Sequence, residues 1–216
     1  MQSRPMALPA PLPPLYAITD LGAAHGQSHA ELVARLAAAG ARLIQVREKS
    51  LPDGSLLPDV IASVKTARSA GALLIVNDRV DLALIAGAHG VHLGEQDLPA
   101  EVARGLLGEN AIIGVSTHSP AGALAAAGAP VDYIALGPIY ATLTKASERP
   151  PLGPEALAWV RSRTSIPLVA IGGITLEKVA EVRKAGADSI ALISDLYSGG
   201  DFEGRLGQYL QALSKA

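Results

Sequence analysis

The chain has 216 residues, 49% of them hydrophobic and 3% aromatic, which suits a single domain with a core of aliphatic side chains. Its 18 basic and 20 acidic residues are spread along the sequence and give a formal net charge of −2, so nothing indicates a nucleic-acid partner or a membrane surface. Cysteine is absent, which excludes disulfides and thiolate chemistry, and no apolar run is long enough to span a bilayer, so we expect a cytoplasmic protein.

Short apolar runs alternate with helix-like segments from residue 15 onward. Such runs are typical of parallel strands buried on both faces, and parallel neighbours need crossovers that are usually helical. Eight repeats of this unit predict an eight-stranded parallel βα (TIM) barrel, whereas an open doubly wound sheet is the weaker alternative because no dinucleotide fingerprint is present. The predicted strands are 15–19, 42–46, 73–76, 90–93, 111–115, 133–136, 167–171 and 189–193, and the predicted helices are 28–39, 55–70, 78–87, 98–107, 119–128, 154–163, 175–185 and 202–213.

Turn and capping residues mark the ends of these units. A Gly-Ala pair closes five of the helices shortly before a strand, where glycine can supply the left-handed conformation that ends a helix. Ser28 and Glu31 have capping-box spacing. Five prolines lie within residues 1–14, so we expect a flexible proline-rich extension there and a barrel domain over 15–216. The Gly-Ala pairs begin at Gly40, Gly71, Gly87, Gly128 and Gly186.

Active sites of βα barrels lie at the carboxyl ends of the strands, so the residues that follow each strand are the candidates for function. Strand alternation after the second run places Gln45, Arg47 and, if the extension continues, Lys49 on the inward side. An inward arginine in an aliphatic barrel needs an anion, which favours a binding role over a solvated strand end.

Carboxylates follow the third and fourth strands. Asp78 and Asp97 could approach one divalent cation, because neighbouring strands lie about 4.8 Å apart, and Mg²⁺ takes one or two carboxylates together with phosphate oxygens. Each aspartate could instead cap the following helix. Asn77 lies beside Asp78, and His92 is either a ligand contact or a hydrogen-bonded packing residue.

The last four strands end in hydroxyls, a long loop and glycines. Ser116 and His118 follow the fifth strand, and the connection 138–153 after the sixth is long enough for a binding loop. Backbone groups after the seventh and eighth strands, where a helix begins at once, could bind a phosphate, although a tight turn would also need the glycines. The candidates in these regions are Thr142, Thr144, Lys145, Gly172, Gly173, Ile193 and Ser194.

Two anion sites thus lie on one rim of the predicted barrel. The cationic site with Arg47, Lys49 and Lys145 suits a diphosphate, and the neutral backbone site suits a monophosphate. This asymmetry favours an enzyme that joins two phosphorylated substrates between the sites.

These motifs resemble the thiamine phosphate synthase family over nearly the whole chain. Each motif is short, but their joint order and spacing are specific; one departure is Ala141, where the family loop often has proline. The matching segments are 16–20, 45–49, 76–78, 91–94 with Asp97, 114–118, 137–139 with 142–145, and 171–174.

The resemblance implies a transferase of thiamine biosynthesis that joins hydroxymethylpyrimidine diphosphate to hydroxyethylthiazole phosphate. Pyrophosphate would leave first, and the thiazole nitrogen would capture a pyrimidine-stabilised carbocation. The resemblance also implies site roles: Mg²⁺ on Asp78 and Asp97, the pyrimidine on Gln45, the thiazole phosphate region on Thr142 and Thr144, and the monophosphate on backbone groups of Gly173, Ile193 and Ser194. The implied diphosphate ligands are Arg47, Lys49, Asn77, Ser116 and Lys145, of which Arg47, Lys49, Ser116 and Lys145 are the catalytic candidates.

Two alternatives remain. A thiazole tautomerase-like barrel would move a proton, for which His118 could serve as acid or base. A non-catalytic sensor of phosphorylated ligands would keep the barrel and its backbone phosphate site. Asn77, the two aspartates and the segment 142–145 argue against the tautomerase. The sensor could dispense with the metal carboxylates Asp78 and Asp97, which this chain has.

Overall fold

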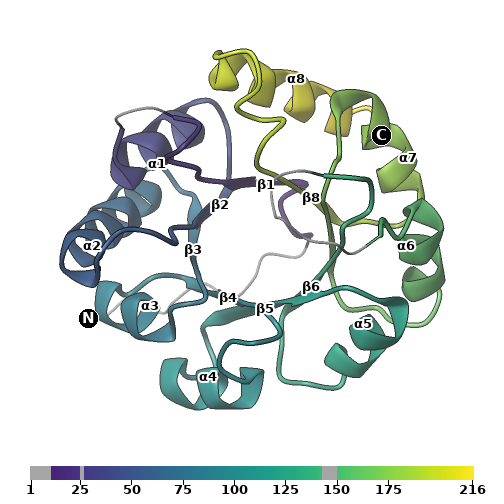
Figure 1. Cartoon of the computed structure of the whole chain (residues 1–216), viewed down its shortest axis with the longest axis horizontal. Helices are drawn as coiled ribbons and strands as arrows, with labels where there is room; N and C mark the ends of the chain where they lie inside the picture. The colour runs from purple at the N-terminus through teal and green to yellow at the C-terminus, as the bar shows by residue number, and fades with distance from the viewer. Residues whose placement is uncertain (1–10, 25–26, 143–149) are drawn as a thin grey trace.

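A computed structural model describes residues 11–24, 27–142 and 150–216, which form a closed parallel barrel in the order β1 to β8. Helices surround the barrel as a ring (Figure 1). The predicted fold is confirmed. The strands are β1 (Leu15–Ile18), β2 (Leu43–Val46), β3 (Leu73–Asn77), β4 (Gly90–Leu93), β5 (Ile112–Thr117), β6 (Tyr133–Leu136), β7 (Leu168–Ile171) and β8 (Ser189–Leu192).

The helices that connect the strands lie close to their predicted positions. They are α1 (His29–Ala38), α2 (Asp53–Ser69), α3 (Val80–Ala86), α4 (Ala100–Leu107), α5 (Pro120–Ala126), α6 (Pro154–Arg161), α7 (Val179–Lys184) and α8 (Phe202–Leu213). The main difference lies before α7, where the chain first forms a short 3₁₀ helix, η1 (Leu176–Lys178). The predicted helix after β7 therefore begins as a tighter turn.

Local capping explains where several helices start and stop. The Ser28 hydroxyl accepts from the Glu31 backbone N–H while the Glu31 carboxylate accepts from Ser28, so the predicted capping box is confirmed. Of the five Gly-Ala pairs, four have glycine with positive φ, and Gly128 is the exception. The turn after α5 closes without a left-handed residue, so the prediction of a left-handed glycine at the end of the helix was wrong for Gly128.

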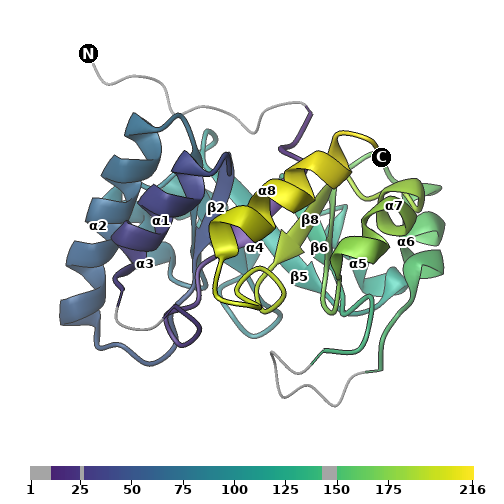
Figure 2. The same cartoon turned by 90° about the horizontal axis from the view of Figure 1, so that it is seen from above.

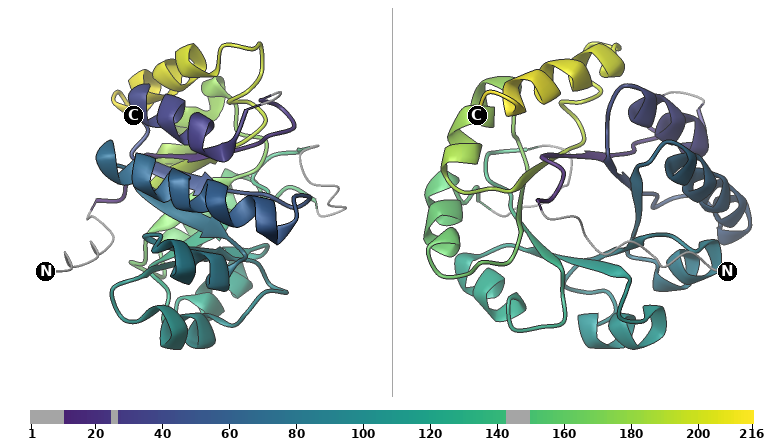
Figure 3. Two further views of the ribbon diagram at one scale, coloured as in Figure 1. Left: turned by 90° about the vertical axis from the view of Figure 1, so that its left-hand side faces the viewer. Right: turned by 180° about the vertical axis from the view of Figure 1, so that it is seen from behind.

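The barrel packs its side chains in two layers because strand residues alternate between the two faces. Outward residues pack against the helices in a large aliphatic cluster. Inward residues form a smaller cluster that includes Tyr16, Ile75, Tyr133 and Val169. Front and back views show the same closed ring (Figures 1 and 3). The polar side chains that follow the inner cluster toward the carboxyl ends of the strands form the site described below.

The end of the proline-rich segment belongs to the barrel. Leu12 is buried in the inner cluster, and the Pro14 carbonyl accepts a hydrogen bond from Ile190 of β8. Residues 1–10 lie outside the described ranges, so the predicted flexible extension stays a prediction for them. In side view, residues 11–14 enter at one end of the barrel (Figure 2). No helix in the described ranges is both long and apolar enough to cross a membrane.

Gly114 makes room for an aromatic ring inside the barrel. A Cβ atom at this position would lie 1.9 Å from Cζ of Tyr133, whose side chain is fully buried. We expect Gly114→Ala to lower the free energy of unfolding by about 3 kcal/mol, because an overpacked core must shift. Urea denaturation measures the change.

Gly105→Ala is the matched control for that experiment. Gly105 lies in α4, and a Cβ atom there would meet nothing within 4 Å. Alanine should raise stability by up to about 1 kcal/mol through helix propensity. Equal stability of the Gly114→Ala variant and the parent chain would contradict the described packing of Tyr133.

Candidate active site

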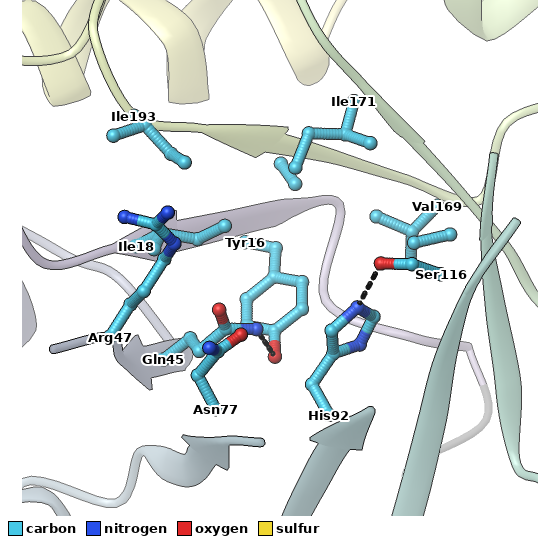
Figure 4. Close-up of a pocket in the computed structure, with 12 residues that line it drawn as sticks. Tyr16, Ile18, Gln45, Arg47, Asn77, His92, Ser116, Val169, Ile171 and Ile193 are labelled. Atoms are coloured by element: carbon cyan, nitrogen blue, oxygen red, sulfur yellow. Dashed lines mark hydrogen bonds between the residues drawn. The ribbon is translucent and has the colours of Figure 1, made fainter. Parts of the chain in front are cut away.

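A pocket opens at the carboxyl ends of the strands, inside the mouth of the barrel (Figure 4). Its walls combine a polar side from β2 to β5 with an apolar side from β6 to β8. Every strand contributes at least one residue. The lining residues are Tyr16, Ile18, Gln45, Arg47, Asn77, His92, Ser116, Ala135, Val169, Ile171, Ala191 and Ile193.

The residues after β2 are positioned as strand alternation predicts. Gln45 is buried, and both Gln45 and Arg47 line the pocket. Lys49 lies farther out, with its side chain 56% exposed and its Nζ atom 3.2 Å from Oδ2 of Asp78. The structure thus brings Gln45 and Arg47 into the pocket and places Lys49 beside one of the predicted metal ligands.

Glu48 organises the loop that carries these cations. One of its carboxylate oxygens accepts backbone N–H groups from Lys49, Ser50 and Leu51 at 2.7, 2.6 and 3.3 Å. Burial alone would raise the pKa of Glu48, but these hydrogen bonds and the Ser50 hydroxyl lower that pKa to about 2. The carboxylate is therefore charged at neutral pH and holds the loop in a fixed turn.

A buried histidine supports the same loop from behind. The Thr19 hydroxyl accepts from the Arg47 backbone N–H at 3.2 Å and lies 2.8 Å from His29 Nδ1. His29 Nε2 lies 3.4 Å from the Glu48 carboxylate. Burial lowers the pKa of His29, despite the nearby carboxylates, which favours a neutral ring. These contacts join β1, α1 and the loop after β2 behind Arg47.

The two aspartates predicted to bind a metal lie next to each other at the rim. Burial and the adjacent Asp97 carboxyl group raise the pKa of Asp78, whereas Lys49 lowers it. Asp97 also accepts the Gly94 backbone N–H at 2.7 Å. Within the described ranges, no group of three or more acidic or histidine side chains is arranged to hold a metal.

The capping alternative for both aspartates was wrong. Asp78 has a φ of 62°, its backbone N–H donates to the His92 carbonyl, and α3 starts after it with Arg79 as N-cap. Pro99 occupies the N-cap position of α4. The left-handed turn at Asp78 ends β3 abruptly, so this carboxylate projects from the strand end toward Lys49 and Asp97.

Ser116 and Asn77 complete the polar wall of the pocket. Ser116 Oγ lies 2.8 Å from His92 Nε2, and His92 Nδ1 lies 2.9 Å from the Tyr133 hydroxyl. His92 is therefore both a hydrogen-bonded, nearly buried residue and a lining residue of the pocket. Asn77 ends β3 opposite His92 in the strand register.

The glycine turn after β7 lies against the connection that follows β6. Gly172 and Gly173 have φ values of 97° and 63°. The Gly172 carbonyl accepts from Tyr140, and a Cβ atom on Gly173 would lie 2.3 Å from the Ala141 carbonyl oxygen. The turn therefore needs glycine for its own geometry. Ile193 lines the pocket beside it, followed by Ser194.

The structure describes one of the three residues predicted to act from the connection after β6. Thr142 is half-buried and is the last residue described before the gap, whereas Thr144 and Lys145 lie outside the described residues. The His118 side chain turns to the backbone, with Nδ1 2.6 Å from the Gly137 carbonyl oxygen.

Proteins that are similar to this chain identify its family. A family model described as thiamine monophosphate synthase matches residues 15–196. The chain belongs to the thiamine phosphate synthase family. It is 45% identical over 192 residues to thiamine-phosphate synthase of Pelotomaculum thermopropionicum, covering 89% of this chain and 88% of the relative. Identity to the enzyme of Methanoculleus marisnigri is 46% over 187 residues, covering 87% and 89%.

A solved structure from the same family has the same fold. Thiamine phosphate pyrophosphorylase from Pyrococcus furiosus superposes with a TM-score of 0.85 at 33% identity, covering 94% of this chain and 96% of that one. Together these relatives confirm the predicted family and the predicted enzyme class, a transferase of thiamine biosynthesis.

Sequence reasoning assigned no role to two tyrosines of this thiamine phosphate synthase site. Tyr16 lines the pocket, and Tyr133 lies directly below it, hydrogen-bonded to His92. Both are inward residues of β1 and β6 and both are buried. Their signal was available, because a phenol in an otherwise aliphatic barrel interior needs a hydrogen-bond partner.

Proposed function

We propose that this chain joins hydroxymethylpyrimidine diphosphate to hydroxyethylthiazole phosphate at the mouth of the barrel, giving thiamine phosphate and pyrophosphate. The observation that carries this proposal is a pocket at the barrel mouth in which Arg47, Asn77 and Ser116 face the apolar residues of β7 and β8. Family membership supplies the reaction class, and the pocket supplies one place where two ligands can meet.

The polar wall is the proposed diphosphate site. Arg47 offers a planar donor fork, and Asn77 and Ser116 offer neutral donors from the neighbouring strand ends. Lys49 stands at the rim, 3.2 Å from Asp78, and Lys145 is proposed to approach from the connection after β6. At an effective dielectric near 20, one charge pair about 4 Å apart is worth roughly 4 kcal/mol, so each cation matters.

The adjacent carboxylates of Asp78 and Asp97 fit Mg²⁺. The raised pKa of Asp78 reflects a buried carboxylate beside a second one, a pair that a hard cation would neutralise. Two carboxylates suit Mg²⁺ because this ion completes its octahedral shell with phosphate oxygens and water. When bound there, Mg²⁺ would stabilise negative charge on the leaving pyrophosphate.

The apolar wall and the glycine turn form the proposed thiazole side. Backbone groups of Gly173, Ile193 and Ser194 would hold the monophosphate, and Thr142 and Thr144 would contact the same region. Gln45 would bind the pyrimidine from below. Ile171 and Ile193 would shield the reacting carbon from water.

The proposed reaction is dissociative. The bond between the pyrimidine methylene carbon and the diphosphate oxygen breaks, and its electron pair leaves with pyrophosphate. The thiazole nitrogen then donates its lone pair to the resulting carbocation and forms the new C–N bond. No proton is removed, so the site needs charge stabilisation and exclusion of water in place of a strong base.

One assay separates this proposal from its alternatives. Purified protein is incubated with both substrates and Mg²⁺, and thiamine phosphate is measured. We expect thiamine phosphate and equimolar pyrophosphate. Conversion of a thiazole carboxylate phosphate alone would instead indicate the tautomerase-like alternative, and ligand binding without turnover would indicate the sensor.

Behind the proposed monophosphate site lies a polar cluster of Asp195, Arg205 and Tyr209. The Arg205 guanidinium donates to Asp195 at 2.8 and 3.1 Å. The Tyr209 hydroxyl contacts the same carboxylate and lies 3.2 Å from the Ile174 carbonyl oxygen. The cluster therefore ties the segments after β7 and β8 to α8.

Tyr209→Phe should loosen this tie without removing any group from the pocket. We expect KM for the thiazole phosphate to rise about fivefold, with kcat and KM for the pyrimidine diphosphate changed less than twofold, because about 1 kcal/mol of hydrogen bonding is lost. Steady-state kinetics with each substrate varied in turn gives the three constants. A uniform loss for both substrates would contradict a selective effect on the monophosphate site.

A further inference from the structure

Five side chains in and below the pocket are hydrogen-bonded in series and come from five different strands. Gln45 Nε2 donates to the Tyr16 hydroxyl at 2.8 Å, and the Tyr16 and Tyr133 hydroxyl oxygens lie 2.9 Å apart. The Tyr133 hydroxyl lies 2.9 Å from His92 Nδ1, and His92 Nε2 lies 2.8 Å from Ser116 Oγ. The first and last of these links are visible in Figure 4. We call this series the relay.

The relay is shielded from water and tightly packed. Tyr16, Tyr133 and Gln45 are at most 2% exposed, and His92 is 7% exposed. The Tyr16 and Tyr133 rings meet edge to face, and the His92 ring stacks on Tyr133. Burial raises the pKa of both phenols, so each keeps its hydrogen at neutral pH. Each phenol therefore has one hydrogen to give and can accept one in return.

The first link sets the direction of all the others. An amide nitrogen can only donate, so the Tyr16 oxygen receives a hydrogen from Gln45. The buried Tyr16 hydroxyl hydrogen also needs an acceptor, and the Tyr133 oxygen is the one within reach. Tyr133 must then give its hydrogen to His92 Nδ1. A neutral histidine with an accepting Nδ1 carries its hydrogen on Nε2, which is directed to Ser116.

We propose that the relay fixes His92 as the Nε2–H tautomer and so presents one acceptor, the Gln45 carbonyl oxygen, and one donor, the Ser116 hydroxyl, to the pocket. Tyr16, Tyr133 and His92 are then positioning residues. With the amide nitrogen of Gln45 bound to Tyr16, its oxygen selects a hydrogen donor on the ring that binds there. With Ser116 already receiving a hydrogen, its own hydrogen is available to an anionic oxygen.

This inference deepens the proposed function, since it assigns the pyrimidine end to an acceptor and the diphosphate end to a donor. The opposite direction would need the Gln45 amide turned over, so that its oxygen accepts from Tyr16, and would leave the Ser116 hydroxyl donating to His92. The Ser116 hydroxyl would then present its lone pairs to the pocket, and these lone pairs would repel the negatively charged phosphate oxygens. The tautomer of His92 therefore reports the direction of the whole relay.

The test is ¹⁵N NMR of the ligand-free protein with labelled histidine, with the His92 signals identified by their loss in His92→Asn. We expect a protonated Nε2 and an unprotonated Nδ1 in the parent chain. Tyr133→Phe removes the donor to Nδ1 and should give a mixture of the two tautomers. Tyr16→Phe removes the link that sets the direction and should also give a mixture. Tyr197→Phe is the matched control, because it removes a buried hydroxyl that donates to the Ile18 carbonyl outside the relay, and it should keep the parent tautomer.

A binding measurement with inorganic pyrophosphate and Mg²⁺ completes the test. Tyr133→Phe should weaken pyrophosphate binding about fivefold, and the control Tyr197→Phe less than twofold, by calorimetry. An Nδ1–H tautomer in the parent chain, or a tautomer and affinity unchanged by Tyr133→Phe, would overturn the proposal. Because the NMR arm uses no substrate, failure of thiamine phosphate formation would leave the relay result standing and would refute the proposed function alone.

Discussion

Asp78→Asn is expected to lower kcat by about 100-fold or more at saturating substrates. The Asp78 carboxylate of the parent chain lies beside Asp97 and Lys49, where it is proposed to bind Mg²⁺. Asparagine is the cleanest substitution because the residue has a φ of 62°, which asparagine adopts more readily than alanine. The variant should also require a higher Mg²⁺ concentration for half-maximal activity. Initial rates over a Mg²⁺ titration measure both effects.

Asp81→Asn is the control for Asp78. Asp81 lies in the first turn of α3, pairs with Arg79, and has a side chain 56% exposed. Its replacement should leave kcat and the Mg²⁺ dependence within twofold of the parent chain. An Asp78→Asn variant with the parent Mg²⁺ dependence would contradict a metal site at this aspartate.

Arg47→Ala is expected to lower kcat/KM for the pyrimidine diphosphate by about 100-fold. Arg47 is the cation that lines the pocket among the described residues, and its guanidinium would hold the diphosphate as negative charge develops on the leaving group. Arg47→Lys should recover part of this loss, because lysine restores the charge without the planar donor fork. Kinetics with the pyrimidine diphosphate varied at fixed thiazole phosphate gives the constants.

Arg163→Ala controls for the loss of an arginine elsewhere. Arg163 follows α6 and stacks over Trp159 on an exposed surface, so its replacement should change kcat/KM less than twofold. If Arg47→Ala raised KM for the thiazole phosphate and left the pyrimidine diphosphate unaffected, the two anion sites would have been assigned in the wrong order.

The fold could be predicted because strand and helix units repeat along the sequence. Runs of Val, Ile, Leu and Ala place strands correctly even where single residues are ambiguous, and closure of the barrel then places the strand ends at one mouth. The same logic correctly placed Gln45 and Arg47 in the pocket, since inward residues alternate along β2.

The detailed geometry could not be predicted, because it depends on contacts between distant strands. Asp78 has a left-handed backbone and a hydrogen bond from its N–H group to the His92 carbonyl on the neighbouring strand, whereas the local sequence equally allowed a helix cap there. The relay joins Tyr16 to Tyr133, 117 positions apart, so no local pattern reveals that their hydroxyls meet. The support of the Arg47 loop by His29 is hidden for the same reason.

A crystal structure with pyrophosphate and Mg²⁺ tests the central claim most directly. The account predicts pyrophosphate in the pocket with its oxygens on Arg47, Asn77 and Ser116, and one Mg²⁺ between the carboxylates of Asp78 and Asp97. Lys145 is expected to contact the same oxygens. Pyrophosphate bound away from Arg47, or Mg²⁺ bound without either aspartate, would contradict the account.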